Sequence, residues 1–284
     1  MIRLLGSILF VCCMTQSNAQ GQPGHSPDSI AYYRKQLQSH HQLRVSAHRG
    51  SSDLAPENTL ATYRRALAMQ VDYIEIDVRT TNDGKLVILH DGTVNRTTNG
   101  TGPVRNLALA DVKKLSAGKG FSGTFAHELI PTLEEVCQLL ADWNVNHPVA
   151  SNLYIDCKDV APEPLVATLT HYGLLTNAVF YGSDTYLAAL QKVAPSARLM
   201  PALQKADDIA NKIRTLHPYA FDVNYSALNE SLIQRIHQQG IQVFSDLLDT
   251  LDQPVHYKRA ARMGVDVIQT DHVMSVYRTL STQN

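Results

Sequence analysis

Short apolar runs alternate with longer amphipathic segments along most of this chain. Eight of the runs have the length and the β-branched and aromatic content of buried strands. These strands are predicted at Val45–Ala47, Tyr73–Asp77, Leu153–Cys157, Ala178–Tyr181, Leu199–Ala202, Ala220–Val223, Gln242–Ser245 and Val267–Thr270. A helical spacing of apolar residues separates them, for example over Leu60–Met69, Leu133–Asp142, Leu165–His171, Tyr186–Val193, Leu232–Gln239 and His256–Met263. Strands that alternate with helices are typical of parallel βα units, so the pattern predicts an α/β fold, a (β/α)8 TIM barrel.

A ninth apolar run, Lys85–Leu89, follows the second predicted strand too closely to leave room for a helix. The intervening residues Thr81–Gly84 include the Asp-Gly pair of a tight hairpin. We therefore predict a hairpin arm that rises from the second strand and returns to the upper rim of the barrel, which keeps the barrel at eight strands.

Residues 92–131 fit the barrel pattern least, because glycine recurs and only one short helix is predicted, near Leu109–Leu115. An excursion of that length inside a compact fold usually has a function, such as covering a site. We predict a small insertion here, directly after His90 and Asp91.

The first 19 residues are predicted to be a cleaved secretory signal peptide. A short basic start, Met1–Arg3, precedes the apolar run Leu4–Met14, which is too short to span a bilayer. Ser17–Ala19 supplies small residues at the positions that a cleavage site before Gln20 requires. We therefore expect export, to the periplasm or to the exterior of the cell.

Two alternatives to this signal peptide remain open at the sequence level. The apolar run could form a buried N-terminal helix, or Cys12 or Cys13 could carry a lipoprotein anchor. The lipoprotein is disfavoured because Val11 stands before Cys12, where a small residue is expected.

Length and composition favour one globular barrel. The chain has 284 residues, of which 44% are apolar and 18% charged, and a formal net charge of −1. Two domains of about 150 residues would fit this length, but a single α/β barrel runs to about 250. The expected division is a signal peptide at 1–19, a leader with a short helix (Ile30–Gln38) at 20–44, and the barrel at 45–284. The near-neutral charge argues against nucleic-acid binding, no stable membrane insertion is expected, and the oligomeric state is left open.

Cleavage of the signal peptide would leave two cysteines, Cys137 in a predicted helix and Cys157 in a predicted strand. Export permits a disulfide between them. We nevertheless favour two buried free thiols, because unpaired cysteines in such elements are often simply buried.

Three carboxylates are predicted to meet at one end of the barrel. Glu75 and Asp77 lie two positions apart on a strand, so both side chains point to the same face. Asp156 adds a third carboxylate from another strand. Such acids repel one another unless a cation lies between them, and oxygen donors favour Mg²⁺ or Ca²⁺. The alternative is that the acids form salt bridges with Arg49 and Lys158.

Two histidines accompany this cluster in the sequence. His48 ends the first predicted strand and His90 ends the hairpin arm. Strand C-termini are where barrels build active sites, and histidine can serve as a general acid or base near neutral pH. Together with the acids, Arg49 and Lys158, the two histidines are typical of a site that handles a phosphoryl group.

The motifs around these residues, in their order and spacing, resemble those of the glycerophosphodiester phosphodiesterase family. The matching strings are AHRG (Ala47–Gly50), PENT (Pro56–Thr59), EIDV (Glu75–Val78), NDGKLVILHD (Asn82–Asp91), NRTTNGTG (Asn95–Gly102), IPTLEEV (Ile130–Val136), an acid-x-Lys at Asp156–Lys158 and GVDVIQTD (Gly264–Asp271). The resemblance therefore covers most of the chain. It implies a TIM barrel with an insertion after the second catalytic histidine. It also implies metal-dependent hydrolysis of small-molecule glycerophosphodiesters to glycerol 3-phosphate and an alcohol.

The resemblance also implies a role for each candidate residue. His48 and His90 are the acid and base, and Arg49 and Lys158 contact the substrate phosphate. Glu75, Asp77 and Asp156 are the ligands of one divalent cation. Glu57 is expected to hold the Arg49 loop or touch the metal, and Asn58 or Thr59 is expected to cap the following helix.

Two departures from the family pattern weaken the substrate assignment. The third metal ligand is usually Glu, whereas here it is Asp156, whose side chain is one methylene shorter. A Trp-Thr-x-Asn motif common in the family is replaced by Val243–Asp246. One alternative is a phospholipase D-like enzyme that acts on lysophospholipid or sphingomyelin, which an apolar rim on the insertion would favour. Another alternative is a non-catalytic homologue that binds its ligand without turnover.

Overall fold

The computed structural model describes residues 27–53 and 55–281, and its strands form one sheet. The strands are β1 (Arg44–Ala47), β2 (Tyr73–Thr80), β3 (Leu86–Ile88), β4 (Asn152–Cys157), β5 (Val179–Tyr181), β6 (Arg198–Met200), β7 (Ala220–Asp222), β8 (Gln242–Asp246) and β9 (Val267–Thr270). Their order across the sheet is β6-β5-β4-β2-β1-β9-β8-β7, and every neighbouring pair along this path is parallel. Apart from β3, which pairs with β2 off this path, and from β6 and β7 at its two ends, strands that follow one another in the chain are neighbours along it.

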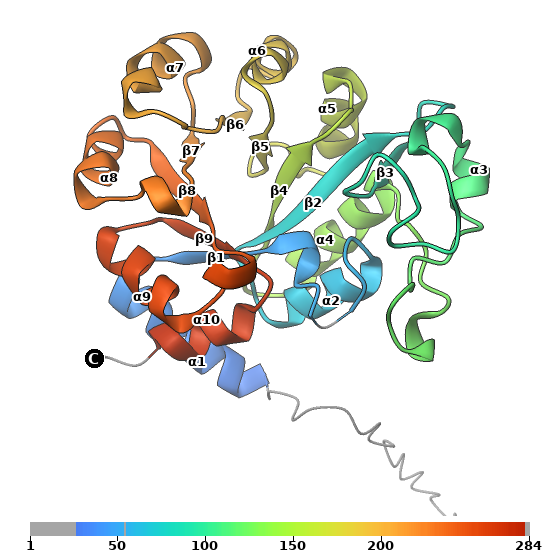
Figure 1. Ribbon diagram of the computed structural model, residues 1–284, viewed down its shortest axis with the longest axis horizontal. Helices are drawn as coiled ribbons and strands as arrows, with labels where there is room; N and C mark the ends of the chain where they lie inside the picture. The colour runs from blue at the N-terminus through green and yellow to red at the C-terminus, as the bar shows by residue number, and fades with distance from the viewer. Residues whose placement is uncertain (1–26, 54, 282–284) are drawn as a thin grey trace, which may run out of the picture.

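The sheet curls until its two ends, β6 and β7, meet (Figure 1). There the backbone N–H of Leu203 donates to the carbonyl of Asp222 over 2.7 Å, and Ala202 pairs with Asp222 in a parallel bridge. Eight parallel strands thus form a nearly closed barrel. The predicted (β/α)8 fold and all eight predicted barrel strands are confirmed.

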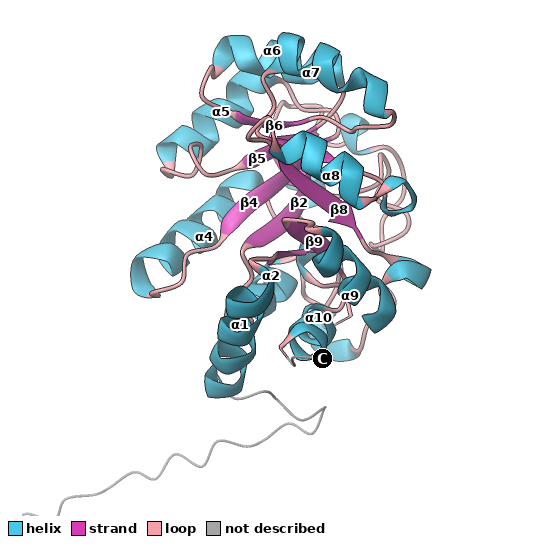
Figure 2. Ribbon diagram, turned by 90° about the vertical axis from the view of Figure 1, so that its left-hand side faces the viewer, coloured by secondary structure: helices cyan, strands magenta, loops and turns pink. Residues whose placement is uncertain are grey.

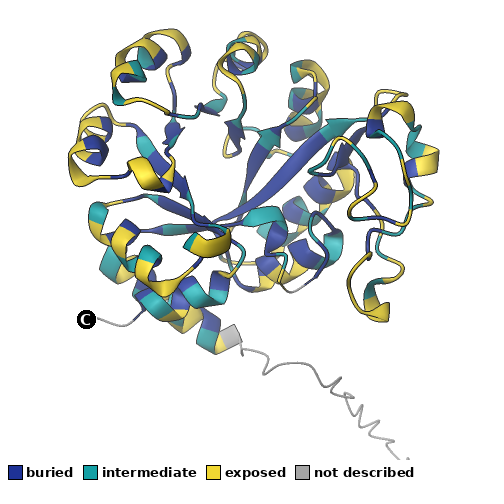
Figure 3. Ribbon diagram, viewed as in Figure 1, coloured by how far each residue is buried: buried dark blue, intermediate teal, exposed yellow. Residues whose placement is uncertain are grey.

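Helices surround the barrel on its outer side (Figure 2). They are α1 (Pro27–His41), α2 (Leu60–Ala68), α3 (Leu109–Val112), α4 (Leu133–Asn146), α5 (Pro162–His171), α6 (Asp184–Val193), α7 (Ile209–Leu216), α8 (Glu230–His237), α9 (Pro254–Met263) and α10 (Val273–Leu280). The strands are buried, while the helices expose their outer faces to solvent (Figure 3). Across the part of the chain that the structure describes, a helix both long and apolar enough to cross a membrane does not occur.

Two hydrophobic clusters fill the two sides of the strands. Tyr73, Tyr154 and Phe244 belong to the cluster inside the barrel, whereas Ile74 and Ile76 pack between the strands and the helices. The alternation of a strand therefore continues the inward series from Tyr73 to Glu75 and Asp77. This places both acids in the barrel interior, as the sequence predicts.

The β2–β3 hairpin and the insertion lie at one side of the barrel (Figure 1). β3 runs antiparallel to β2, with Val78 opposite Ile88, so the predicted hairpin arm is confirmed. Residues 92–131 contain the short α3 and have a small core of their own with the hairpin. This core comprises Val87, Leu89, Val94, Val104, Val112, Ala117 and Ile130.

The N-terminal helix α1 packs against α10 on the outside of the barrel (Figure 1). It contains the predicted short helix Ile30–Gln38 and extends beyond it at both ends. The predicted signal peptide, residues 1–19, lies outside the described residues. Cys137 and Cys157 are both buried and unbridged, as predicted.

Candidate active site

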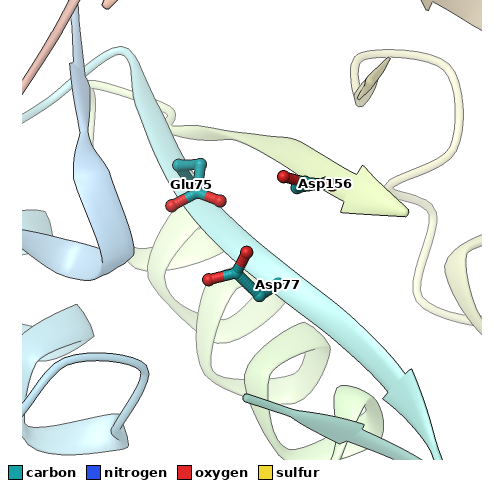
Figure 4. Close-up of side chains that lie close together, drawn as sticks. All are labelled: Glu75, Asp77 and Asp156. Atoms are coloured by element: carbon teal, nitrogen blue, oxygen red, sulfur yellow. The ribbon is translucent and has the colours of Figure 1, made fainter. Parts of the chain in front are cut away.

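Three acids from two adjacent strands converge inside the barrel. β2 and β4 pair in a register that sets Asp77 directly opposite Asp156, with Glu75 two residues earlier on β2. The side chains point toward one another (Figure 4), and one carboxylate oxygen of each lies within 4.8 Å of the others. Asp77 and Asp156 come from the carboxyl-terminal halves of their strands, which is the end of a barrel where active sites lie, and Glu75 lies one inward-facing position before Asp77.

The three acids of the cluster carry like charges that repel one another when ionised. Glu75 and Asp77 are only 3% and 1% exposed. Burial, followed by the negative charges of Asp77 and Asp156, holds the pKa of Glu75 well above its ordinary value. Burial also raises the pKa of Asp156, although the neighbouring Lys158 ammonium opposes that effect. The cluster therefore requires positive charge in order to be fully ionised.

Two cationic side chains, those of Lys158 and Arg49, lie beside the cluster. Lys158 Nζ lies 2.5 Å from Asp156 Oδ2 and 3.2 Å from Asp77 Oδ1. Arg49 Nε lies 3.6 Å from Asp77 Oδ2, and the Arg49 backbone N–H donates to Glu75 Oε2 over 2.7 Å. At the sequence level, salt bridges to Arg49 and Lys158 are the alternative to a cation site. These salt bridges are present, and the three acids also converge.

The donor set fits a hard divalent cation. Its three members offer carboxylate oxygens, which are the donors that Mg²⁺ and Ca²⁺ prefer. Asn58 fixes one of them, because its Nδ2 donates to Asp77 Oδ2 over 2.8 Å while its own Oδ1 accepts from the Tyr63 hydroxyl. Supporting hydrogen bonds of this kind orient metal ligands. Thr59, rather than Asn58, caps α2 by accepting from the backbone N–H of Thr62.

A tight turn after β1 presents His48 and Arg49. The chain enters a single 3-10 turn at His48, and the left-handed φ angles of Arg49 (+47°) and Gly50 (+87°) reverse its direction. A Cβ at position 50 would lie 2.4 Å from Thr62 Cγ2, so only glycine fits. The turn packs on α2 and places the Arg49 side chain beside Asp77 and the His48 ring beside Asp271.

His48 is oriented by a carboxylate from the far end of the chain. Its Nδ1 lies 3.1 Å from Asp271 Oδ1, which also accepts from the Ser52 hydroxyl. Burial alone would raise the pKa of Asp271, but the hydrogen bond and charge of His48 hold it below its ordinary value. The backbone N–H of Asp271 donates to Asp252 Oδ2 over 2.8 Å, which holds the main chain of Asp271 in place.

His90 has a corresponding carboxylate partner, and a chain of ion pairs joins it to Arg49. His90 Nδ1 lies 2.8 Å from Asp91 Oδ1. Arg96 donates to both oxygens of Asp91 and to both oxygens of Glu57. Glu57 Oε1 in turn accepts from Arg49 Nη1 over 3.0 Å. Glu57 therefore holds the Arg49 side chain, whereas the sequence predicts that it holds the Arg49 loop or touches the metal.

Residues 48–275 match the family described as the glycerophosphoryl diester phosphodiesterase family. The chain belongs to this family. It is 34% identical to the glycerophosphodiester phosphodiesterase of Caldanaerobacter subterraneus subsp. tengcongensis, over 80% of this chain and 93% of that protein. It is 33% identical to a glycerophosphodiester phosphodiesterase of Bacillus subtilis, over 72% of this chain and 76% of that one.

The likeness extends to solved structures of the family. The crystal structure of a glycerophosphodiester phosphodiesterase from Agrobacterium tumefaciens superposes with a TM-score of 0.75 and 28% identity. The match covers 83% of this chain and 99% of that one. The barrel, the family and the expectation of an enzyme are thereby confirmed.

A polar cavity lies beside the candidate site, and Asp156 and Lys158 are among its lining residues. The cavity has a volume of about 640 Å³. Its other lining residues are mostly polar or charged: Cys157, Tyr181, Gly182, Ser183, Asp184, Ala202, Gln204, Asp208 and Lys212. Such a lining suits a hydrophilic substrate better than an acyl chain.

Sequence reasoning missed the residues that orient the predicted ones. The sequence predicts no role for Asp271 and Arg96, although both lie inside the family motifs, and it predicts Asn58 only as a candidate helix cap. Asp271 lies 223 positions from His48, so local spacing gave no signal for the contact. Asp91 did carry a signal, because it follows His90 directly.

Proposed function

We propose that this protein hydrolyses glycerophosphodiesters to glycerol 3-phosphate and an alcohol. The observation that carries the proposal is the convergence of Glu75, Asp77 and Asp156 beside two carboxylate-held histidines. Membership of the family and its named relatives support it. A phosphodiesterase of Oleispira antarctica, which shares this fold at 24% identity and a TM-score of 0.75, is described in complex with the product sn-glycerol-3-phosphate.

The three acids would hold one divalent cation, Mg²⁺ or Ca²⁺. When bound, such a cation polarises the phosphoryl group and stabilises the negative charge that develops on its oxygens. Arg49 and Lys158 border the same acids and would contact the substrate phosphate. They would balance charge that the transition state adds to the phosphate oxygens.

His48 and His90 would move the protons. In each ring Nδ1 faces a carboxylate, Asp271 or Asp91, which fixes the tautomer and turns Nε2 away from that partner. One histidine would deprotonate the nucleophile, either water, which gives glycerol 3-phosphate directly, or a glycerol hydroxyl of the substrate, which gives a cyclic phosphate that a water molecule must then open. The other would protonate the leaving alkoxide.

A panel of substrates assayed with each metal tests this function. Glycerophosphocholine, glycerophosphoethanolamine and lysophosphatidylcholine are incubated with the protein in Mg²⁺, Ca²⁺ or Mn²⁺, and the products are followed by phosphorus NMR. We expect glycerol 3-phosphate from the first two, and loss of turnover on addition of EDTA. Selective turnover of the lysolipid, or a cyclic phosphate as end product, would instead establish the phospholipase D-like alternative. No turnover with any metal would establish the binding homologue.

We also propose that the protein is exported after removal of residues 1–19. The support is the basic start, the short apolar run and the small residues before Gln20. Mass spectrometry of the protein recovered from the periplasm or culture medium of a bacterial host tests the proposal. An N-terminus at Gln20 is expected, whereas an uncleaved cytoplasmic chain would contradict export.

A further inference from the structure

Arg96 joins the two loops that carry His90 and Arg49, although it lies in the insertion. Its Nη1 and Nη2 donate to the Glu57 carboxylate over 2.7 and 2.8 Å, and its Nε and Nη2 donate to the Asp91 carboxylate over 2.8 and 2.9 Å. We propose that Arg96 is a positioning residue for the reaction, which sets His90 through Asp91 and Arg49 through Glu57. This inference rests on the proposed function of the site.

The His90 ring depends on Arg96 more than the His48 ring depends on any one group. The carboxylate beside His48, Asp271, is also held by Ser52 and belongs to a segment that Asp252 fixes through the backbone. For the Asp91 carboxylate, the described residues supply hydrogen bonds from His90 and Arg96 alone. Removal of Arg96 would therefore leave Asp91 and His90 to rotate as a pair.

The backbone of His90 is held separately from its ring. Arg79 donates to the carbonyl of His90 from Nη2 and from Nε, over 2.5 and 3.0 Å. These bonds fix the main chain, but they do not set the direction of the imidazole. Loss of Arg96 would thus disturb the orientation of the side chain while the hairpin remains folded.

The shape of the arginine side chain suits this double contact. A guanidinium is planar and carries donors on two edges, so it can pair with two carboxylates at once. Lysine has a single ammonium on a flexible stem and cannot reproduce both paired contacts. Glu57 is more buried than Arg96 itself, since the Glu57 side chain is 16% exposed and the Arg96 side chain 46%. The pKa of Glu57, which burial would raise, is held below its ordinary value by Arg96 and Arg49.

The test compares kcat and KM for glycerophosphocholine in the wild type, Arg96→Ala, Arg96→Lys and a control, Lys114→Ala. The control removes an exposed ion pair with Asp111 in the same insertion, away from both loops. We expect Arg96→Ala to lower kcat by about tenfold to a hundredfold, because small misplacements of reacting groups have effects of that size. Arg96→Lys should recover part of the loss, KM should change less than kcat, and the control should match the wild type.

A double-mutant comparison with Asp91 tells whether Arg96 positions His90 through Asp91 or only stabilises the insertion as a whole. In an Asp91→Ala background, Arg96→Ala should lower kcat by a clearly smaller factor than in the wild type, because only the route through Glu57 to Arg49 remains. A thermal transition measured for every variant establishes folding, and Arg96→Gln replaces Arg96→Ala if the latter does not fold. Two results would overturn the inference: wild-type kinetics in the Arg96 variants, or an equally large loss of kcat on Arg96→Ala with and without Asp91. The proposed function would still stand in either case, provided that the wild type is active. An inactive wild type would overturn the proposed function and the inference with it.

Discussion

At the scale of single residues, the two histidines of the site are held in the same way, because Nδ1 of each lies at hydrogen-bond distance from an aspartate. Removal of a general acid or base typically lowers turnover by about 10²–10⁴-fold. We expect His48→Ala and His90→Ala each to lose kcat by about that factor while they remain folded, as measured by steady-state assay and circular dichroism. His237→Ala is the matched control, since His237 also lies 2.8 Å from an aspartate, Asp266, but on α8. Near-wild-type turnover in either site variant would refute its assignment.

The ion pairs of Arg96 also predict how stability depends on pH. The Arg96 hydrogen bond is the main cause that holds the pKa of Asp91 far below its ordinary value, and Arg96 also contributes to the lowered pKa of Glu57. A carboxyl group with a lowered folded-state pKa adds stability above its unfolded-state pKa, and that stability is lost as pH falls through the folded-state value. The gap in unfolding free energy between wild type and Arg96→Ala should therefore stay constant from about pH 7 to about pH 5 and shrink as the pH falls below about 4. Urea titrations at several pH values measure the gap, and a gap that stays constant over the whole range would contradict the prediction.

The sequence predicted the convergence of the three acids better than the contacts that orient His48 and Arg49. Glu75 and Asp77 share a face because of strand alternation, which is a local property, and Asp156 joins them because the parallel strands of a barrel align. The contacts of Asp271 with His48 and of Arg96 with Glu57 depend on closure of the barrel and on the path of the insertion. No pattern of polar and apolar residues encodes these paths.

At the scale of elements, periodicity located the strands and most helices, while caps set where the helices begin. Predicted strands differ from the observed ones by only a few residues at their ends, and α4 begins at the predicted Leu133 but runs on to Asn146. Two helices, α7 and α10, were not among those the sequence analysis specified. Both are 8 residues long, as is α8, which was predicted, so length alone does not account for the difference.

The start of α4 is fixed by a capping box that can be tested. The Thr132 hydroxyl accepts from the Glu135 backbone N–H over 3.1 Å, and the Glu135 carboxylate accepts from the Thr132 backbone N–H over 2.8 Å. Thr132→Ala should lower the free energy of unfolding by about 1 kcal/mol, because it leaves a helix N-terminal N–H without its partner. Urea denaturation measures the change. Thr170→Ala, the same substitution at an exposed position of α5, should change stability by less than about 0.5 kcal/mol, and an equal loss in both variants would argue against the cap.

At the scale of the whole molecule, the barrel collects into one site groups that are scattered along the chain. β1 carries the His48 turn between β2, which carries two of the acids, and β9, after which Asp271 follows. The antiparallel β3 then returns the chain to this rim, so that His90 and the insertion start beside the acids. The near-neutral net charge of the chain therefore conceals a strongly charged centre.

That centre predicts that a divalent cation stabilises the fold as well as the reaction. Glu75 and Asp77 are buried, and each raises the free energy of the other when both are ionised. A cation bound only by the folded protein adds about 2.7 kcal/mol at a hundred times its Kd. We expect Mg²⁺ or Ca²⁺ to raise the melting temperature of the metal-stripped protein, as measured by calorimetry, and EDTA to reverse the rise. Asp156→Asn should lose most of this response, whereas Asp111→Asn, which removes an exposed acid of the insertion, should keep it. An equal response in Asp156→Asn would show that these acids do not hold the ion.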